Sequence, residues 1–148
     1  MPYPIKFAAT GIDLSARFAS NNTIVGSPAA ASETVVASVT GLDTQLAVFV
    51  GVYIAGTMSF TVGTSGTAVR LRIRTGTTAG AGTVVSDSGA LTGGVAAGNL
   101  MSIDLTGLDT TSANGTALAS SSYCLTLTVT SGAAASTVSQ ANILAIIA

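Results

Sequence analysis

The sequence predicts a single all-β domain built as an antiparallel β-sandwich. From residue 33 onward, short runs rich in Val, Ile and Leu alternate with clusters of Gly, Thr, Ser and Asp, at spacings typical of sandwiches and barrels. Two of these runs alternate apolar and polar residues, which places one face of each strand in a core. Few stretches favour a helix, and 148 residues suffice for one domain with a sizeable core.

Residues 1–27 differ from the rest of the chain. They contain Pro2 and Pro4 and three of the seven aromatic residues (three Tyr and four Phe), without sustained alternation. They could form an edge strand and loop packed on their own domain, or an extended arm that clasps a neighbouring subunit. We place a domain boundary here, with the sandwich at 28–148. The apolar residues that an arm would use for contact are Tyr3, Ile5 and Phe7.

Seven runs are expected to form strands, and they lie at 33–39, 46–62, 68–75, 83–87, 100–105, 123–130 and 137–147. The second run is long, and Gly51 or Gly56 could bend or divide it, because Gly in a strand often marks a bend. In the run at 123–130, Tyr123 and every second residue after it are apolar, whereas Cys124 and the threonines share the other face.

The run at 68–75 places three like charges on one strand face. Val69, Leu71 and Ile73 alternate with Arg70, Arg72 and Arg74. One interpretation is an outer face on which each guanidinium lies in water. Another is a protein interface, because arginines supply planar donors to carboxylates and carbonyls and are enriched at contact surfaces. A phosphate or glycan site is the third.

The C-terminal run is apolar on both faces at residues 142–147. Such a strand should be covered on both sides, either in the centre of a sandwich or at a subunit interface. We expect an inner strand near an oligomer axis. The candidate contact residues are Ile143, Ile146 and Ile147.

The segment TGLDT occurs at residues 40–44 and again at 106–110. Gly permits a positive φ and Asp can bond to the nearby backbone, so two similar turns are expected, with an internal duplication as the alternative. If both turns lay at the same end of the sandwich, Asp43 and Asp109 could hold a calcium ion together with backbone carbonyls.

The residues needed for common enzyme chemistry are missing or scattered. The chain has no histidine, which removes the usual general base and metal ligand. Its one cysteine, Cys124, therefore has no imidazole partner and is expected to be a small side chain that is buried or half-buried. The six acidic residues are well separated in sequence. We expect no enzyme, no cofactor and no metal, although an enzyme that uses backbone groups or a bound metal remains an alternative.

Charge and hydropathy limit the classes of partner. Five basic and six acidic residues give a net charge of −1, so no long-range field attracts nucleic acid. The mean hydropathy is +0.66. The longest apolar run, at 46–60, contains two glycines and is shorter than the roughly 20 residues of a membrane-spanning helix. We expect neither a nucleic acid nor a membrane partner.

Two stretches resemble the small β-sandwich proteins of tailed-phage virions, most closely capsid decoration (cement) proteins. They are TSGTAVRLRIRTGTTAGAGTVV at 64–85 and ASTVSQANILAIIA at 135–148. The resemblance implies a jelly-roll-like sandwich, a homotrimer, made in the host cytoplasm and bound to the capsid exterior. There it would clamp subunits of the major capsid protein, with the N-terminal arm facing the shell and the C-terminal strand facing the other copies.

Two other binding functions remain open at this point. A receptor-binding or fibre-tip module of a virion would present aromatic or polar clusters at loop tips, but the chain has no Trp, and Tyr53 and Tyr123 lie in expected strands. A pilin-like or surface-layer subunit would need a secretion signal or a donor strand, and residues 1–27 could contain the donor strand.

Overall fold

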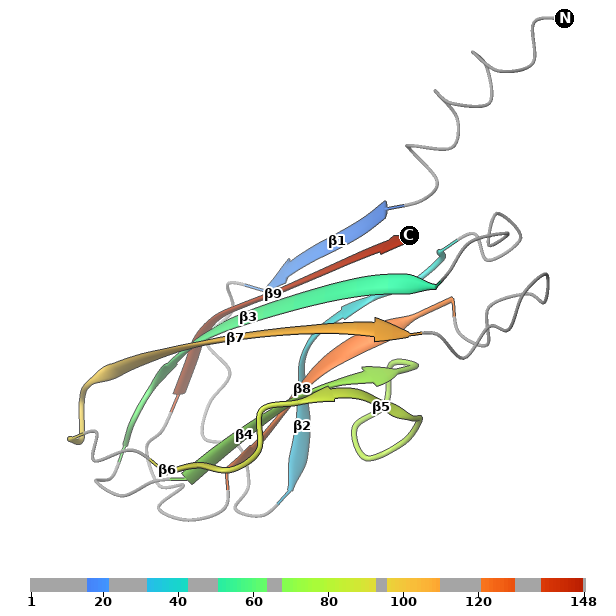
Figure 1. The fold of residues 1–148 in the computed structure, drawn as a ribbon. Coiled ribbons are helices and arrows are strands. Elements are labelled where there is room, and N and C mark those ends of the chain that lie inside the picture. Colours follow the sequence, from blue (N-terminus) through green and yellow to red (C-terminus); the bar gives the residue numbers. More distant parts are fainter. Residues whose placement is uncertain are drawn as a thin grey trace, which may run out of the picture.

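The computed structural model describes residues 16–21, 32–42, 51–63, 68–92, 96–109, 121–129 and 137–147. Within these residues the chain forms nine strands in two antiparallel sheets that lie face to face (Figure 1). The expected all-β sandwich is therefore confirmed. None of the described residues forms a helix long and apolar enough to cross a membrane.

Each sheet combines strands from distant parts of the sequence. Sheet A has the order β1-β9-β3-β7, with β1 at Ala16–Asn21, β9 at Thr137–Ile147, β3 at Val52–Thr61 and β7 at Leu100–Asp109. Sheet B has the order β2-β8-β4-β5, with β2 at Glu33–Val39, β8 at Tyr123–Val129, β4 at Ala68–Thr75 and β5 at Val84–Asp87. The short strand β6, Leu91–Thr92, also pairs with β4.

The pairing of the strands is nested. The first strand pairs with the last, β2 with β8, β3 with β7 and β4 with β5, all antiparallel. Further pairing of β3 with β9 and of β4 with β8 joins these pairs into two sheets. Because β5 and β6 both pair with β4, they act as one interrupted strand, and the arrangement is that of an eight-stranded jelly roll. The jelly-roll-like fold implied by the resemblance is confirmed.

The core lies between the sheets and follows from the alternation of apolar residues. Along β3, every second residue from Val52 to Phe60 is buried. Gly56 belongs to this inward set, and a Cβ there would lie 2.6 Å from Cδ1 of Leu125 on the opposite sheet. The largest fully buried side chains are Tyr123, Phe60, Ile54, Met58, Leu71, Ile73, Leu125, Leu127, Ile143, Val36, Val52 and Val62.

Most expected strands are present, several with the expected bounds. The strands at 33–39, 68–75 and 137–147 are confirmed residue by residue. Strand β3 starts directly after Gly51 and continues through Gly56 without interruption, and residues 43–50 lie outside the described residues. Strand β1 lies on the N-terminal side of the boundary placed after residue 27 and pairs with β9. That boundary stays a prediction.

The turn expected at 106–110 is wrong. Residues 106–109 continue β7, which pairs with β3 from Leu100 as far as Asp109. Gly107 is needed here for a close approach rather than for a turn, because a Cβ would lie 3.0 Å from side-chain atoms of both Val85 and Ser86 on β5. In the other copy of the segment, Gly41 follows β2 with a φ of 71°, as a turn requires.

Candidate interaction surfaces

The outer face of sheet B carries a network of arginines and carboxylates. The Arg74 guanidinium donates from Nε and Nη2 to the two carboxylate oxygens of Glu33. Arg72 donates from Nη1 to Glu33 Oε2 at 3.3 Å. The hydroxyl of Thr126 also donates to Glu33. This carboxylate lies beneath the guanidinium groups, and its side chain is 12% exposed.

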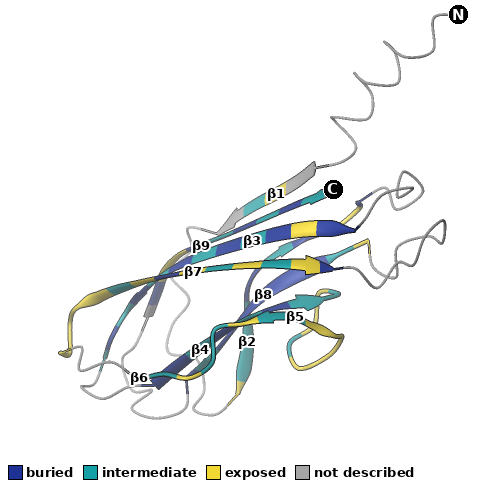
Figure 2. Cartoon of the chain, in the orientation of Figure 1, coloured by how far each residue is buried: buried dark blue, intermediate teal, exposed yellow. Residues whose placement is uncertain are grey.

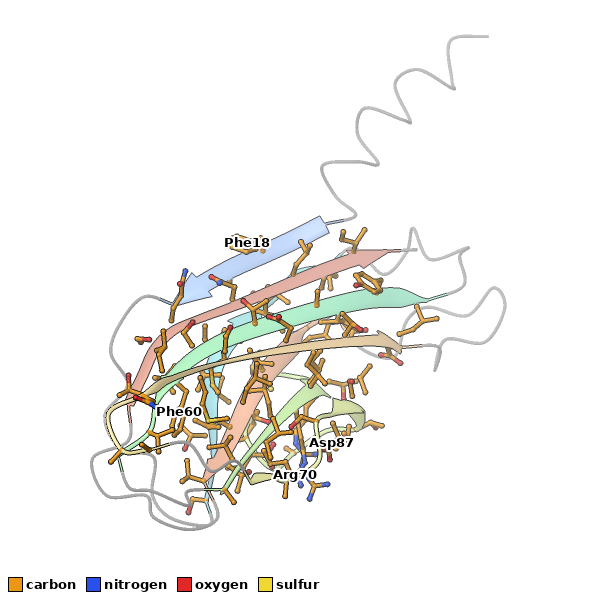
Figure 3. The ribbon with its side chains drawn as sticks, turned by 60° about the vertical axis from the view of Figure 1, so that its left-hand side comes forward. Phe18, Phe60, Arg70 and Asp87 are labelled. Carbon is orange, nitrogen blue, oxygen red and sulfur yellow. The ribbon has the colours of Figure 1, made fainter. Side chains whose placement is uncertain are left out.

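Asp87 takes the corresponding place at the other end of the network. It accepts from Nε and Nη2 of Arg70 and, at 3.0 Å, from Nε of Arg72. The Arg70 hydrogen bonds hold the pKa of Asp87 well below its ordinary value, and the backbone N–H of Gly89 and Arg72 act in the same direction against the effect of burial. Figure 3 shows Arg70 and Asp87 side by side at one side of the sandwich.

Burial opposes the ionisation of Glu33, but hydrogen bonds from Arg74 and Thr126 outweigh it and hold the Glu33 pKa below its ordinary value. In turn, the hydrogen bond to Glu33 raises the pKa of Arg74. Both carboxylates therefore stay charged, and two negative charges reduce the mutual repulsion of the three arginines.

All three guanidinium groups donate to carboxylates of the same chain, so Arg72 and Arg74, at 17% and 12% exposure, do not lie free in water, whereas Arg70 is 38% exposed. The interface and phosphate or glycan interpretations stay predictions. Sequence reasoning missed Glu33 and Asp87, which are separated from their arginines by 15 to 41 residues. The network also explains why Thr126 is fully buried on the outward face of β8, and why Cys124 on the same face is buried, as was expected for it. They are the cross-strand neighbours of Arg72 and Arg74, whose long side chains cover them.

The outer face of sheet A is apolar at one end, in contrast to the charged outer face of sheet B. Two cross-strand rows at one end of the sheet are mostly apolar, and the exposed Thr106 on β7 is the polar member of the first row. Their apolar members are Phe18, Leu144 and Ala55, and Ile146, Tyr53 and Leu108; we call these six residues the apolar end of sheet A.

The apolar end is open to solvent. Phe18 is 64% exposed, Leu108 47% and Tyr53 40%, and these three are among the five large apolar residues that are exposed in the described part of the chain. Figure 2 shows exposed residues at the corresponding ends of β3 and β7, and Figure 3 shows Phe18 on β1, far from Arg70. Clustered exposed apolar side chains mark interaction sites more often than single ones do.

Of the contact residues expected on β9, Ile143 is fully buried in the core and Ile146 is half-buried in the outer face. Ile147 is in β9 beside Val52, and its side chain is outside the described ones. The expected inner strand is confirmed, because β9 lies between β1 and β3. The arm residues Tyr3, Ile5 and Phe7 lie outside the described residues.

Sequence reasoning did not select Phe18, Tyr53, Leu108 and Leu144 as contact residues. For Tyr53 a signal was available, since it is the one large apolar residue at the outward positions of β3, where the others are Ala, Thr and Ser. Phe18 is in a strand without clear alternation, and Leu108 is in the segment expected to be a turn.

Three side chains with titratable groups, Tyr123, Asp109 and Cys124, are buried. The Tyr123 hydroxyl donates to Oδ2 of the buried Asp109 at 2.8 Å. Burial, together with Asp109, raises the pKa of Tyr123. Burial also raises the pKa of the Cys124 thiol. Asp43 lies outside the described residues, so the calcium hypothesis is untested, and no three His, Cys, Asp or Glu residues converge on a metal site in the described part.

Comparisons with known proteins relate the chain to others by fold. No protein-family model and no curated protein sequence matches it. A chain of the infectious bursal disease virus VP2 subviral particle matches with a TM-score of 0.54 and 18% identity, over 89% of this chain and 33% of that one. A chain of the T13 particle of the same virus matches with a TM-score of 0.54 and 12% identity, over 90% and 31%.

The chain thus spans about a third of these viral chains, and at such identities the likeness establishes the shared β-sandwich. A chain of Bacillus endospore appendages, described as disulfide-linked pili, matches with 18% identity and a TM-score of 0.42. The match covers 89% of this chain and 89% of that one. That score is too low to support an inference. The resemblance to tailed-phage decoration proteins stays a prediction.

Proposed function

We propose that the chain is a structural subunit of a virion, a capsid decoration (cement) protein that binds the outer capsid surface and stabilises the shell. The observation that carries the proposal is the apolar end of sheet A, where β1, β3 and β7 present exposed apolar side chains and β9 adds half-buried ones. Such a surface is suited to binding protein. The resemblance of residues 64–85 and 135–148 to decoration proteins supports the finer assignment.

This function needs binding and no catalysis. A protein that binds the assembled shell more tightly than the dissociated subunits shifts the equilibrium toward the shell. A homotrimer would increase the effect, because the second and third contacts of one trimer form at high effective concentration. The neutral, hydroxyl-rich chain adds little charge to the shell.

The partner at the shell is the major capsid protein, and Tyr3, Ile5 and Phe7 of the arm are the residues that we assign to this contact. The receptor-binding alternative gains no support from the tyrosines that it would use. Tyr123 is fully buried, and Tyr53 lies on a sheet face.

Sedimentation with preassembled shells tests the proposal. Shells of the major capsid protein from the virus that encodes the chain are mixed with increasing amounts of the purified protein and pelleted. We expect saturable co-sedimentation and a higher melting temperature of the shells. A full-length variant with Ser at Tyr3, Ile5 and Phe7 should keep its fold and lose shell binding. If the wild-type chain remains in the supernatant even in large molar excess, the proposal is wrong.

A further inference from the structure

We propose that the first half of β7, at residues 100–104, binds an extended segment of another protein by strand addition, with a basic side chain of that segment beside Asp104. This binding site goes beyond the capsid role and does not depend on it. Three features of β7 support it: the direction of its backbone groups, the regularity of the strand and the side chains around it.

Alternate residues of β7 turn their backbone groups away from the rest of the sheet. The strand lies at the margin of sheet A, beside β3 (Figure 1). Just before it, the C=O of Asn99 accepts a hydrogen bond from the N–H of Val62, which follows β3. Odd-numbered residues of β7 therefore bond toward β3, because hydrogen-bonded and non-hydrogen-bonded pairs alternate in an antiparallel ladder. The even-numbered Thr106 points the other way, since its C=O accepts from Oγ of Ser86 on β5 at 2.6 Å.

Three residues in the first half of β7 have open backbone groups at this edge. The outward N–H and C=O groups of Leu100, Ser102 and Asp104 have no hydrogen-bond partner among the described residues. These groups repeat every two residues, about 7 Å apart, as the matching groups of an added strand do. In the second half, β5 lies against the strand at Thr106 and Gly107. The first half is therefore the part of β7 that can take a further strand.

The other edges of the described sheets are shorter or irregular. Strand β5 has four residues and a register shift against β4. Strand β2 has a register shift between Val35 and Ala37. Strand β1 has six residues and contacts β2. Bulges and short strands hinder the addition of another strand, whereas β7 keeps an unbroken register with β3 over ten residues.

The side chains of the first half of β7 define the chemistry of the partner. Met101 and Leu105 are half-buried and pack against the core on either side of the buried Ile103. The residues of an added strand that face the same side should therefore be apolar. On the other side, Leu100 is 64% exposed, and Asp104 is the one charged side chain described on the outer face of sheet A. A Lys or Arg beside Asp104 attracts it, whereas an acidic residue is repelled.

Two fluorescein-labelled hairpin peptides test the proposal. Each presents an edge strand of alternating Val and Thr, in which one Thr is replaced by Lys in the first peptide and by Glu in the second. A hairpin is used because a preorganised strand loses less conformational entropy on binding. Fluorescence anisotropy measures the dissociation constants for the full chain. We expect the Lys peptide to bind with a dissociation constant below about 1 mM, and the Glu peptide to bind about 3- to 10-fold more weakly.

Substitutions at residues 102 and 104 provide matched variants. Ser102→Ala keeps the backbone N–H, whereas Ser102→Pro removes it where the donor faces away from β3, so the ladder with β3 stays complete. We expect Ser102→Ala to bind like the wild type. Ser102→Pro should bind at least about 10-fold more weakly, because the donor is lost and the ring obstructs the partner strand. Asp104→Lys should reverse the preference and bind the Glu peptide more tightly, a readout that needs no proline variant to fold.

Two results overturn the proposal. One is that neither peptide binds the wild type at concentrations up to about 1 mM. The other is that the peptides bind, but Asp104→Lys leaves the preference for Lys over Glu unchanged or a folded Ser102→Pro binds as tightly as Ser102→Ala. Neither result affects the capsid role, which co-sedimentation with shells tests separately.

Discussion

Replacing Glu33 by Gln removes one negative charge from beneath the arginines of sheet B while keeping the size of the side chain. In the wild type this carboxylate accepts two hydrogen bonds from Arg74, one from Arg72 and one from Thr126. Removing one partner of a buried ion pair costs about 3–5 kcal/mol, whereas an exposed pair contributes about 0.2–1 kcal/mol.

The side chains concerned are 12% to 17% exposed, which is closer to the buried case. We therefore expect Glu33→Gln to lower the free energy of unfolding by about 2–4 kcal/mol, which for a chain of this size lowers the melting temperature by about 5–15 °C. Urea unfolding of both proteins at the same concentration measures the change, so that any association of copies affects both alike.

The effect should also depend on pH. Because the folded state lowers the Glu33 pKa, its charge stabilises the fold above the ordinary value of 4.5, and this stabilisation is lost as the pH falls through the lowered pKa. The difference between wild type and Glu33→Gln should therefore shrink below pH 4.5.

Asp104→Asn is the matched control, because this carboxylate is exposed on the other sheet. It should change the free energy of unfolding by less than about 0.5 kcal/mol. If Glu33→Gln costs no more than this control, Arg72 and Arg74 are solvated in the folded protein, and the reasoning from the network is refuted.

Two substitutions and one labelling experiment test the core. Tyr123→Phe leaves the buried Asp109 carboxylate without the hydroxyl donor, so we expect a loss of about 1.5–3 kcal/mol in urea unfolding; an unchanged midpoint would contradict the hydrogen bond. Gly56→Ala forces a Cβ against Leu125 and should cost about 1–3 kcal/mol by the same measurement, whereas a neutral effect would mean that the Leu125 side chain moves aside without loss of packing. The Cys124 thiol should resist a chromogenic disulfide reagent at neutral pH until the protein is unfolded, because it is buried and its pKa is raised; rapid reaction of the native protein would show that β8 opens.

The fold class and several strands follow from the sequence because alternation is a local property. In β4 the apolar residues and the arginines separate cleanly between the two faces, and the strand has the expected bounds. Strand β9 is apolar on both faces, which indicates an inner strand whatever its partners are. By contrast, β1 contains Phe18 without a regular pattern, and its assignment depends on pairing with β9.

The candidate surfaces were harder to predict because they depend on contacts distant in sequence. The arginine stripe is visible in the sequence, but its carboxylates come from β2 and β5. The apolar end of sheet A combines single residues from four strands, and each of them looks unremarkable alone. The Gly in each TGLDT segment was interpreted as a turn signal. At position 107, however, a glycine is needed because β5 lies too close for a Cβ atom.

Hydroxyl-radical labelling read by mass spectrometry measures most directly whether the apolar end of sheet A is covered in solution. We predict that Phe18 and Tyr53, which are 64% and 40% exposed in the single chain, are labelled more slowly in protein bound to capsid shells than in free protein. A reference peptide added to both samples should be labelled at the same rate. Equal labelling rates for Phe18 and Tyr53 in the two samples would contradict the assignment of this face as the contact surface.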